Sequence, residues 1–150
     1  MNIRFAGRDD IPQVLALYRH LDADDKVTAA EDAVANWERL QLYPGSGIVA
    51  GCLGDIMVAT CTLIVIPNLT RCGAPYALIE NVVTHAEHRS RGYGKAVLKA
   101  AAEAAWAAGC YKVMLMTGSR RPETLKFYED AGFEQSKTGF QMRRLPVRAE

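Results

Sequence analysis

The sequence carries no strong charge of either sign. Its 150 residues include 18 Lys and Arg against 17 Asp and Glu, which gives a formal net charge of +1 at pH 7. A nucleic-acid-binding domain displays a basic patch or stripe. This sequence has no basic run and no basic stretch interleaved with aromatics. The composition therefore argues against a nucleic-acid partner.

Long hydrophobic runs are also missing. The longest apolar stretch, 56–67, is much shorter than a membrane span requires. The first residues, Met-Asn-Ile-Arg-Phe-Ala, lack the apolar segment of a signal peptide. These absences predict no membrane partner. The length suits one domain over residues 1–150, long enough to bury a core of its own.

Cysteines are few, and their spacing is wrong for a metal site. None of the four forms a Cys-x-x-Cys pair or stands at a zinc-ligand spacing from a histidine, so we predict no bound metal. Cys52, Cys61 and Cys110 lie in apolar surroundings, which predicts buried free thiols in a reducing cytoplasm. Cys72 stands beside Gly73 in a loop and is expected to be exposed.

The stretch 89–95, Arg-Ser-Arg-Gly-Tyr-Gly-Lys, has the features of an anion-binding turn. It follows an extended apolar run, 77–84, and precedes an amphipathic helix that we expect to begin near Gly92. The first N–H groups of a helix have no partner within the helix, and the helix dipole makes that end partly positive. Glycines let a phosphate approach the backbone. Positive side chains add to the attraction: Arg89, Arg91 and Lys95.

Two common phosphate motifs do not fit this stretch. The dinucleotide fingerprint needs a third glycine where Val97 stands, and the P-loop needs Ser or Thr where Ala96 follows Lys95. A strand-to-helix turn that merely needs two glycines is the simpler alternative. The pattern that does match is Arg-x-x-Gly-x-Gly over residues 89–94.

This pattern, placed after Val82-Val83-Thr84, resembles the acetyl-CoA site of the GNAT superfamily of N-acetyltransferases. The stretch 126–133, Lys-Phe-Tyr-Glu-Asp-Ala-Gly-Phe, resembles that superfamily's second signature, in the same order and at about the same spacing. The resemblance covers roughly residues 1–145. It implies an α/β fold of the α+β type, with a central twisted mixed sheet of about six to seven strands and about four flanking helices.

The resemblance also implies a reaction and residues for it. Acetyl-CoA would be the co-substrate, and a primary amine of a small molecule would attack it directly in a ternary complex, without a covalent intermediate. The backbone of Val82, Val83 and Thr84 would bind the pantetheine arm, with the Val82 N–H polarising the thioester carbonyl. The phosphates would be held by the whole turn: Arg89, Ser90, Arg91, Gly92, Tyr93, Gly94 and Lys95.

Two side chains are candidates for proton transfer. By resemblance, Tyr128 would protonate the leaving thiolate; alternatively it is a core aromatic. Glu80 is our candidate base, directly or through water, although it could instead orient the substrate or pair with an arginine. His85 is a weaker candidate, and His20 and His88 are weaker still.

Periodicity predicts the elements around these residues. Glu80 and Asn81 stand side by side in the strand expected at 76–84, which indicates a β-bulge. That strand should run parallel to one at 111–117, because a helix crosses between them. The remaining expectations are a strand at 3–6, helices beginning near 9–10, 28 and 119, a hairpin of 47–53 with 55–66, and two strand-like pieces within 133–145. Thr28 and Ser119 are the expected caps of their helices.

The acceptor is harder to predict. In the resembling superfamily the first two helices wall the acceptor pocket, so Tyr18, Trp37 and Tyr43 could touch the substrate; plain core packing is the alternative. A rival function is a non-catalytic acyl-CoA-binding or regulatory module on the same fold, which would keep the glycine turn but could lose the proton donor.

Within the superfamily, the sequence most resembles the glucosamine 6-phosphate N-acetyltransferases. The matching stretches are 79–83, 109–112 and 126–129. The resemblance implies a homodimer, with Tyr111 and Lys112 near the acceptor's phosphate. Those enzymes carry Asp where this chain has Met116, and a thioether cannot replace a carboxylate facing an ammonium. The sequence therefore predicts a small primary amine other than glucosamine 6-phosphate as the preferred acceptor.

Overall fold

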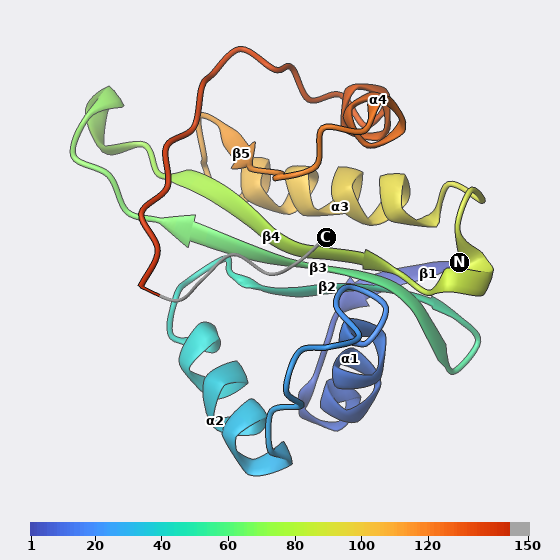
Figure 1. Ribbon diagram of the computed structural model, residues 1–150. Coiled ribbons are helices and arrows are strands. Elements are labelled where there is room, and N and C mark those ends of the chain that lie inside the picture. Colours follow the sequence, from blue (N-terminus) through green and yellow to red (C-terminus); the bar gives the residue numbers. More distant parts are fainter. Residues whose placement is uncertain (145–150) are drawn as a thin grey trace.

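A computed structural model of the chain describes residues 1–144, whose strands form one five-stranded sheet (Figure 1). The strands follow chain order across the sheet, and only the last pair, β4 with β5, is parallel. Their bounds are β1 Asn2–Phe5, β2 Gly47–Leu53, β3 Ile56–Ile66, β4 Tyr76–Thr84 and β5 Val113–Leu115. The predicted mixed α/β fold is confirmed, with slightly fewer strands than expected.

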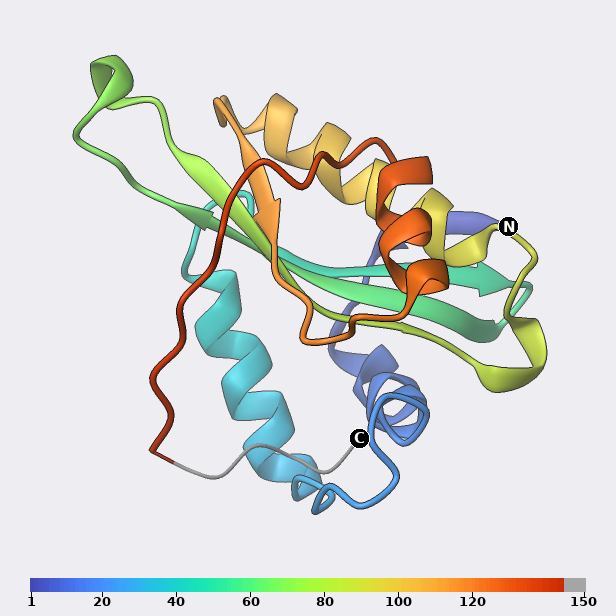
Figure 2. The ribbon, with the colours of Figure 1, turned by 45° about the horizontal axis from the view of Figure 1, so that its top comes forward.

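Four α-helices cover the two faces of the sheet. On one face lie α1 (Ile11–Tyr18) and α2 (Ala30–Gln41), and on the other lie α3 (Tyr93–Ala107) and α4 (Pro122–Asp130), as Figure 1 shows. Short 3-10 turns occupy Arg8–Asp10, Arg71–Gly73 and Ala86–His88. From both viewpoints α4 lies beside the first half of α3 (Figures 1 and 2).

Each face of the sheet carries its own apolar layer. Under α3, buried Leu63 and Ile79 of the sheet pack with Leu98 and Ala101 of the helix. The alanines of α3 let the helix approach the sheet closely. The second layer, under α1 and α2, is smaller and includes Val14, Leu17 and Ile48.

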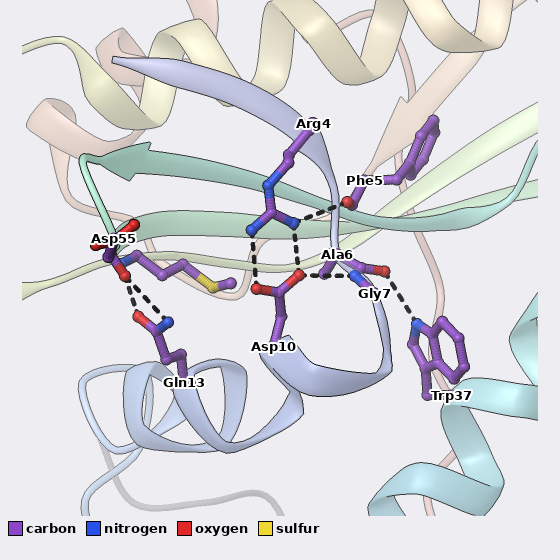
Figure 3. Close-up of polar contacts among 9 residues, drawn as sticks. Arg4, Phe5, Ala6, Gly7, Asp10, Gln13, Trp37 and Asp55 are labelled. Atoms are coloured by element: carbon purple, nitrogen blue, oxygen red, sulfur yellow. Dashed lines mark hydrogen bonds and ion pairs between the residues drawn. The ribbon is translucent and has the colours of Figure 1, made fainter.

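Polar contacts fix the start of the chain on the second layer (Figure 3). The Asp10 carboxylate accepts hydrogen bonds from the Arg4 guanidinium and, at 2.7 Å, from the Gly7 N–H. The bonded Arg4 holds the pKa of this carboxyl below its usual range. The Trp37 indole N–H donates to the Ala6 carbonyl at 3.2 Å, so α2 is anchored to the end of β1.

The predicted bulge is present in β4. Thr60 of β3 lies opposite Val83, but Thr62, two residues on, lies opposite Glu80, so β4 carries one extra residue. Asn81 within it takes the left-handed conformation, with φ 52°. Asparagine tolerates this conformation better than most residues. A bulge of this kind bends a strand and increases its twist.

Three sequence expectations are wrong. Residues 133–144 form no strand, although 145 lies outside the described residues, and Figure 2 shows this segment passing β5 toward α2 without joining the sheet. Its alternating Phe140 and Met142 are 93% and 100% exposed. A segment with alternating apolar residues forms a strand only when one face of that strand packs against a neighbour. The N-caps of α2 and α4 are Ala29 and Arg121, not Thr28 and Ser119.

The cysteine predictions are confirmed in their burial pattern. Cys52, Cys61 and Cys110 are buried free thiols, and Cys72 is exposed. Burial raises the pKa of Cys61 to about 12. This thiol therefore stays protonated and unreactive. Within residues 1–144, no helix has the length and apolar character to cross a membrane.

Candidate active site

The site begins where β4 and β5 part. The two strands pair only from Ala77 opposite Val113 to Ile79 opposite Leu115. Beyond the bulge, residues 80–84 keep β3 as a partner on one side, and no strand of the described chain pairs with their other side. Backbone N–H and C=O groups on that side are therefore available to a ligand.

A cavity of about 590 Å³ lies along this open edge. Its wall is built from the end of β4, the turn that follows, the start of α3 and the inner side of α4. Ten of the twelve predicted site residues line it: Val82, Val83, Thr84, Arg89, Ser90, Gly92, Tyr93, Gly94, Lys95 and Tyr128. Glu80 and Arg91 are not among the lining residues.

The turn before α3 has the geometry expected of an anion site. Ser90 and Gly92 both take left-handed backbone conformations, with φ of 60° and 80°. Gly92 is the N-cap of α3. The N–H groups of the next three residues therefore have no partner within the helix. A Cβ built on Gly92 would have no atom within 4 Å, so the space beside this glycine, which lines the cavity, is unfilled.

Gly94 has a packing role in addition to the one we expected. A Cβ at this position would lie 2.8 Å from Thr84 Oγ1 and 3.2 Å from Phe127 Cζ. Gly94 is therefore required for the close packing of α3 against β4 and α4. Sequence reasoning assigned both glycines to ligand approach, and the structure separates them into a packing glycine and an open one.

The positive side chains of the turn are largely engaged with the protein. Arg89 donates to the Thr84 carbonyl through Nε at 3.4 Å and to the His20 carbonyl through Nη2 at 3.0 Å. Lys95 lies 3.5 Å from the Asp130 carboxylate, which Lys126 also contacts at 2.9 Å. Hydrogen bonding from Lys126 lowers the pKa of Asp130, so this carboxylate is charged at neutral pH. Less free positive charge faces the cavity than the sequence suggested.

Tyr128 stands on α4 and lines the cavity, half-buried beside Phe127. Burial raises the pKa of its hydroxyl, and the charge of Glu80 raises it further. Tyr128 is therefore protonated at neutral pH, as a proton donor must be. Glu80 is half-buried in the bulge opposite Thr62, close enough for its charge to act on Tyr128.

Sequence reasoning missed several lining residues, and it named His20 only as a weak candidate base. His20 and Leu21 reach the cavity from the loop after α1, and Glu123, Thr124 and Lys126 reach it from α4. No sequence pattern connects the first two with the turn, which lies far along the chain. The α4 residues had a weak signal, because Lys126 and Asp130 stand four apart, the spacing of a helical ion pair.

The aromatic candidates for acceptor binding differ in their surroundings. Trp37 packs on the second layer and donates to a backbone carbonyl, which is a structural role. Tyr43 is 52% exposed at the end of α2. The Tyr18 hydroxyl lies 3.5 Å from Thr62 Oγ1, next to the bulge. Of the three, Tyr18 is best placed to reach a molecule bound near Glu80.

Comparison with known proteins gives the family. A model of the Acetyltransferase (GNAT) family matches residues 14–133, most of the chain. The chain belongs to the GNAT family of acetyltransferases. The predicted family is confirmed, and with it the prediction of an acetyl-CoA-dependent N-acetyltransferase.

Three individual proteins are informative relatives. A glucosamine 6-phosphate N-acetyltransferase of Trypanosoma brucei brucei is 30% identical over 136 residues, which cover 89% of this chain and 88% of that protein. A putative acetyltransferase of Agrobacterium tumefaciens is 45% identical, with a TM-score of 0.90 over 96% of this chain and all of that one. A transcriptional regulator of Bacillus halodurans is 28% identical, with a TM-score of 0.82 over 95% of this chain and 98% of that one.

Proposed function

We propose that this chain transfers the acetyl group of acetyl-CoA to a primary amine of a small molecule, and that the 590 Å³ cavity holds the CoA. One observation carries the proposal: Tyr128 lines the same cavity as the open β4 edge and the α3 N-terminus. A phosphate group, a pantetheine arm and a thiolate leaving group would each meet a suitable partner there. Acetyl-CoA would supply the activated acetyl group as its thioester.

Different residues of the chain would bind different parts of acetyl-CoA. The N–H groups at the start of α3 and the Arg89 side chain would bind the phosphates. Backbone groups of Val82, Val83 and Thr84 would bind the pantetheine amides along the open edge. The Val82 N–H would polarise the thioester carbonyl, a kind of contribution worth roughly 3–4 kcal/mol in other acyl transfers.

Two proton transfers complete the reaction. Glu80, directly or through a water molecule, would remove a proton from the acceptor ammonium so that its nitrogen can attack the carbonyl carbon. As the C–N bond forms and the C–S bond breaks, Tyr128 would give its proton to the thiolate. Direct attack fits the site, because none of the four cysteines lines the cavity and residues 1–144 contain no Ser–His hydrogen bond.

A second candidate acceptor is favoured by a specific observation. The Trypanosoma relative is named a glucosamine 6-phosphate N-acetyltransferase, so this sugar phosphate is the natural alternative substrate. Met116 argues against it. This side chain directly follows β5 and is 60% exposed. Its thioether cannot pair with an ammonium as a carboxylate does.

We therefore expect glucosamine 6-phosphate to be a poorer acceptor than another small amine. A missing charge-assisted hydrogen bond costs about 1.5–3 kcal/mol, or roughly 10–150-fold in rate if the bond acts in the transition state. The test is thiol release from acetyl-CoA with a panel of amino acids, polyamines and amino sugars, read as kcat/KM. Met116→Asp is the matched variant, and it should raise the value for glucosamine 6-phosphate by a similar factor.

Two outcomes would contradict this account. If glucosamine 6-phosphate is the best substrate of the wild-type chain, at more than about 10⁴ M⁻¹s⁻¹, another residue supplies the carboxylate. If no amine in the panel releases thiol although CoA binds, the non-catalytic module is the better description. The homodimer, the cytoplasmic location and the single-domain organisation stay predictions.

A further inference from the structure

All three histidines of this chain gather in one place, although nothing in the proposed chemistry uses them. The His20 and His85 ring centroids lie 4.1 Å apart, and the His85 and His88 centroids lie 5.4 Å apart. His20 comes from the loop after α1, His85 follows β4, and His88 ends the 3-10 turn before Arg89. We call these three residues the histidine cluster.

The histidine cluster stands at the phosphate side of the cavity. His20 and His88 line the cavity together with Arg89 and Gly92. The Arg89 guanidinium donates to the His20 carbonyl, which holds the loop after α1 against the turn. A group bound at the start of α3 would therefore lie close to the His20 ring.

The three imidazoles are not equivalent. His85 Nδ1 accepts a hydrogen bond from the Glu87 N–H at 3.3 Å. His88 Nδ1 is buried and has no hydrogen-bond partner within residues 1–144. Neither feature applies to the His20 ring, and of the three histidines only His20 comes from the loop after α1.

Charges of both signs face His20. Partial burial, the His85 ring and the Arg89 charge lower the pKa of His20, while Glu87 opposes them. Across the cavity, Lys95 and Lys126 share the Asp130 carboxylate, and Glu123 adds one negative charge. A bound phosphate group would offset Arg89 and favour the protonated imidazole.

We propose that His20 is a further CoA-binding residue, which takes up a proton as the phosphates of CoA enter the cavity. CoA binding and proton binding are then linked, and each favours the other. The proposal rests on the proposed function, because it places CoA in the same cavity. It adds a residue from a distant segment and a dependence of affinity on pH.

The direction in which pH changes CoA affinity follows from the linkage between CoA binding and proton binding. The complex holds more protons than the free chain over the range where His20 titrates. CoA affinity should therefore fall as pH rises from 5.5 to 8.5. The expected loss is about 3- to 50-fold, the Coulombic range for unit charges about 7 Å apart near a protein surface.

The experiment is calorimetry of CoA binding from pH 5.5 to 8.5, in two buffers of different ionisation enthalpy. The wild-type chain should take up protons on binding. In His20→Gln the dependence of affinity on pH should flatten, while the Arg89 bond to the residue-20 carbonyl is kept because it involves the backbone. His85→Gln is the comparison variant: His85 does not line the cavity but lowers the pKa of His20, so the pH dependence should persist with its midpoint at higher pH.

Two further measurements separate the contribution of His20 from other sources of pH dependence. The 3′-phosphate of CoA titrates near pH 6 itself, but its contribution is common to all three chains and is absent with dephospho-CoA. Proton NMR on the wild-type chain gives a second readout, because its three histidines give three Hε1 signals and the spectrum of His20→Gln identifies the one from His20. The His20 signal should titrate at higher pH with CoA bound.

The same measurements distinguish a failure of this inference from a failure of the proposed function. If CoA binds with the same pH dependence in the wild-type chain and in His20→Gln, and the His20 signal does not move, the inference is wrong and the proposed function stands. If the wild-type chain binds no CoA at any pH, both are wrong.

Discussion

The Gly92→Asp variant should bind CoA at least a hundredfold more weakly than the wild-type chain. Gly92 caps α3, and a side chain at this position projects into open space beside the helix N-terminus. A carboxylate there would stand where the phosphates are proposed to bind. Unit charges about 5 Å apart near a protein surface repel by roughly 3 kcal/mol, which corresponds to more than a hundredfold.

Gly92→Asn is the matched control for this variant. This position has a left-handed backbone with φ 80°. Asparagine and aspartate have the same shape, and both tolerate that conformation, so any strain is shared and only the charge differs. Calorimetry of CoA binding to the two folded variants is the measurement. Equal affinities would show that the phosphates do not bind at this turn.

Gly94 would be a poor choice for the same test. A side chain there would collide with Thr84 and Phe127, so a loss of CoA binding would have a second explanation in disturbed packing. The open space beside Gly92 and the filled space beside Gly94 are what distinguish the two positions.

Replacing Tyr128 with phenylalanine should slow turnover by roughly 10²–10⁴-fold, the range for a lost general acid. The phenyl ring keeps the contact with Phe127, and CoA affinity should change little because no phosphate contact is lost. The raised pKa of Tyr128 keeps its proton in place at neutral pH. The rate of the wild-type enzyme should therefore fall as pH rises through that pKa, and the variant should lack this fall.

Steady-state thiol release and CoA calorimetry test the variant together. Tyr76→Phe is the matched control, because Tyr76 lies at the start of β4 and does not line the cavity. It should keep the wild-type rate. A loss below about threefold in a Tyr128→Phe chain that still binds CoA would make Tyr128 a packing residue.

The sequence predicted those parts of the site that are local in the chain. The turn at 89–94 and the bulge at Glu80-Asn81 could both be read from short stretches, because glycine and paired polar residues change the backbone where they stand. Tyr128 was found by resemblance to the family, since its helical spacing alone is equally typical of a core aromatic.

The parts that were missed depend on contacts between distant segments. His20 reaches the turn only because the loop after α1 folds over it, and its bond with Arg89 spans 69 positions of the sequence. The packing role of Gly94 depends on Phe127 of another helix. Two strand-like pieces were predicted within 133–145, but the apolar Phe140 and Met142 in this segment are both exposed. The pattern gives no information on whether a partner strand lies beside it.

A crystal structure of the chain with CoA tests the central claim most directly. The account predicts the pyrophosphate on the backbone N–H groups at the start of α3 and the pantetheine arm along residues 82–84. It also predicts the CoA sulfur within hydrogen-bond reach of the Tyr128 hydroxyl, about 3–4 Å. A CoA bound outside this cavity, or with its sulfur directed away from Tyr128 toward another proton donor, would contradict it.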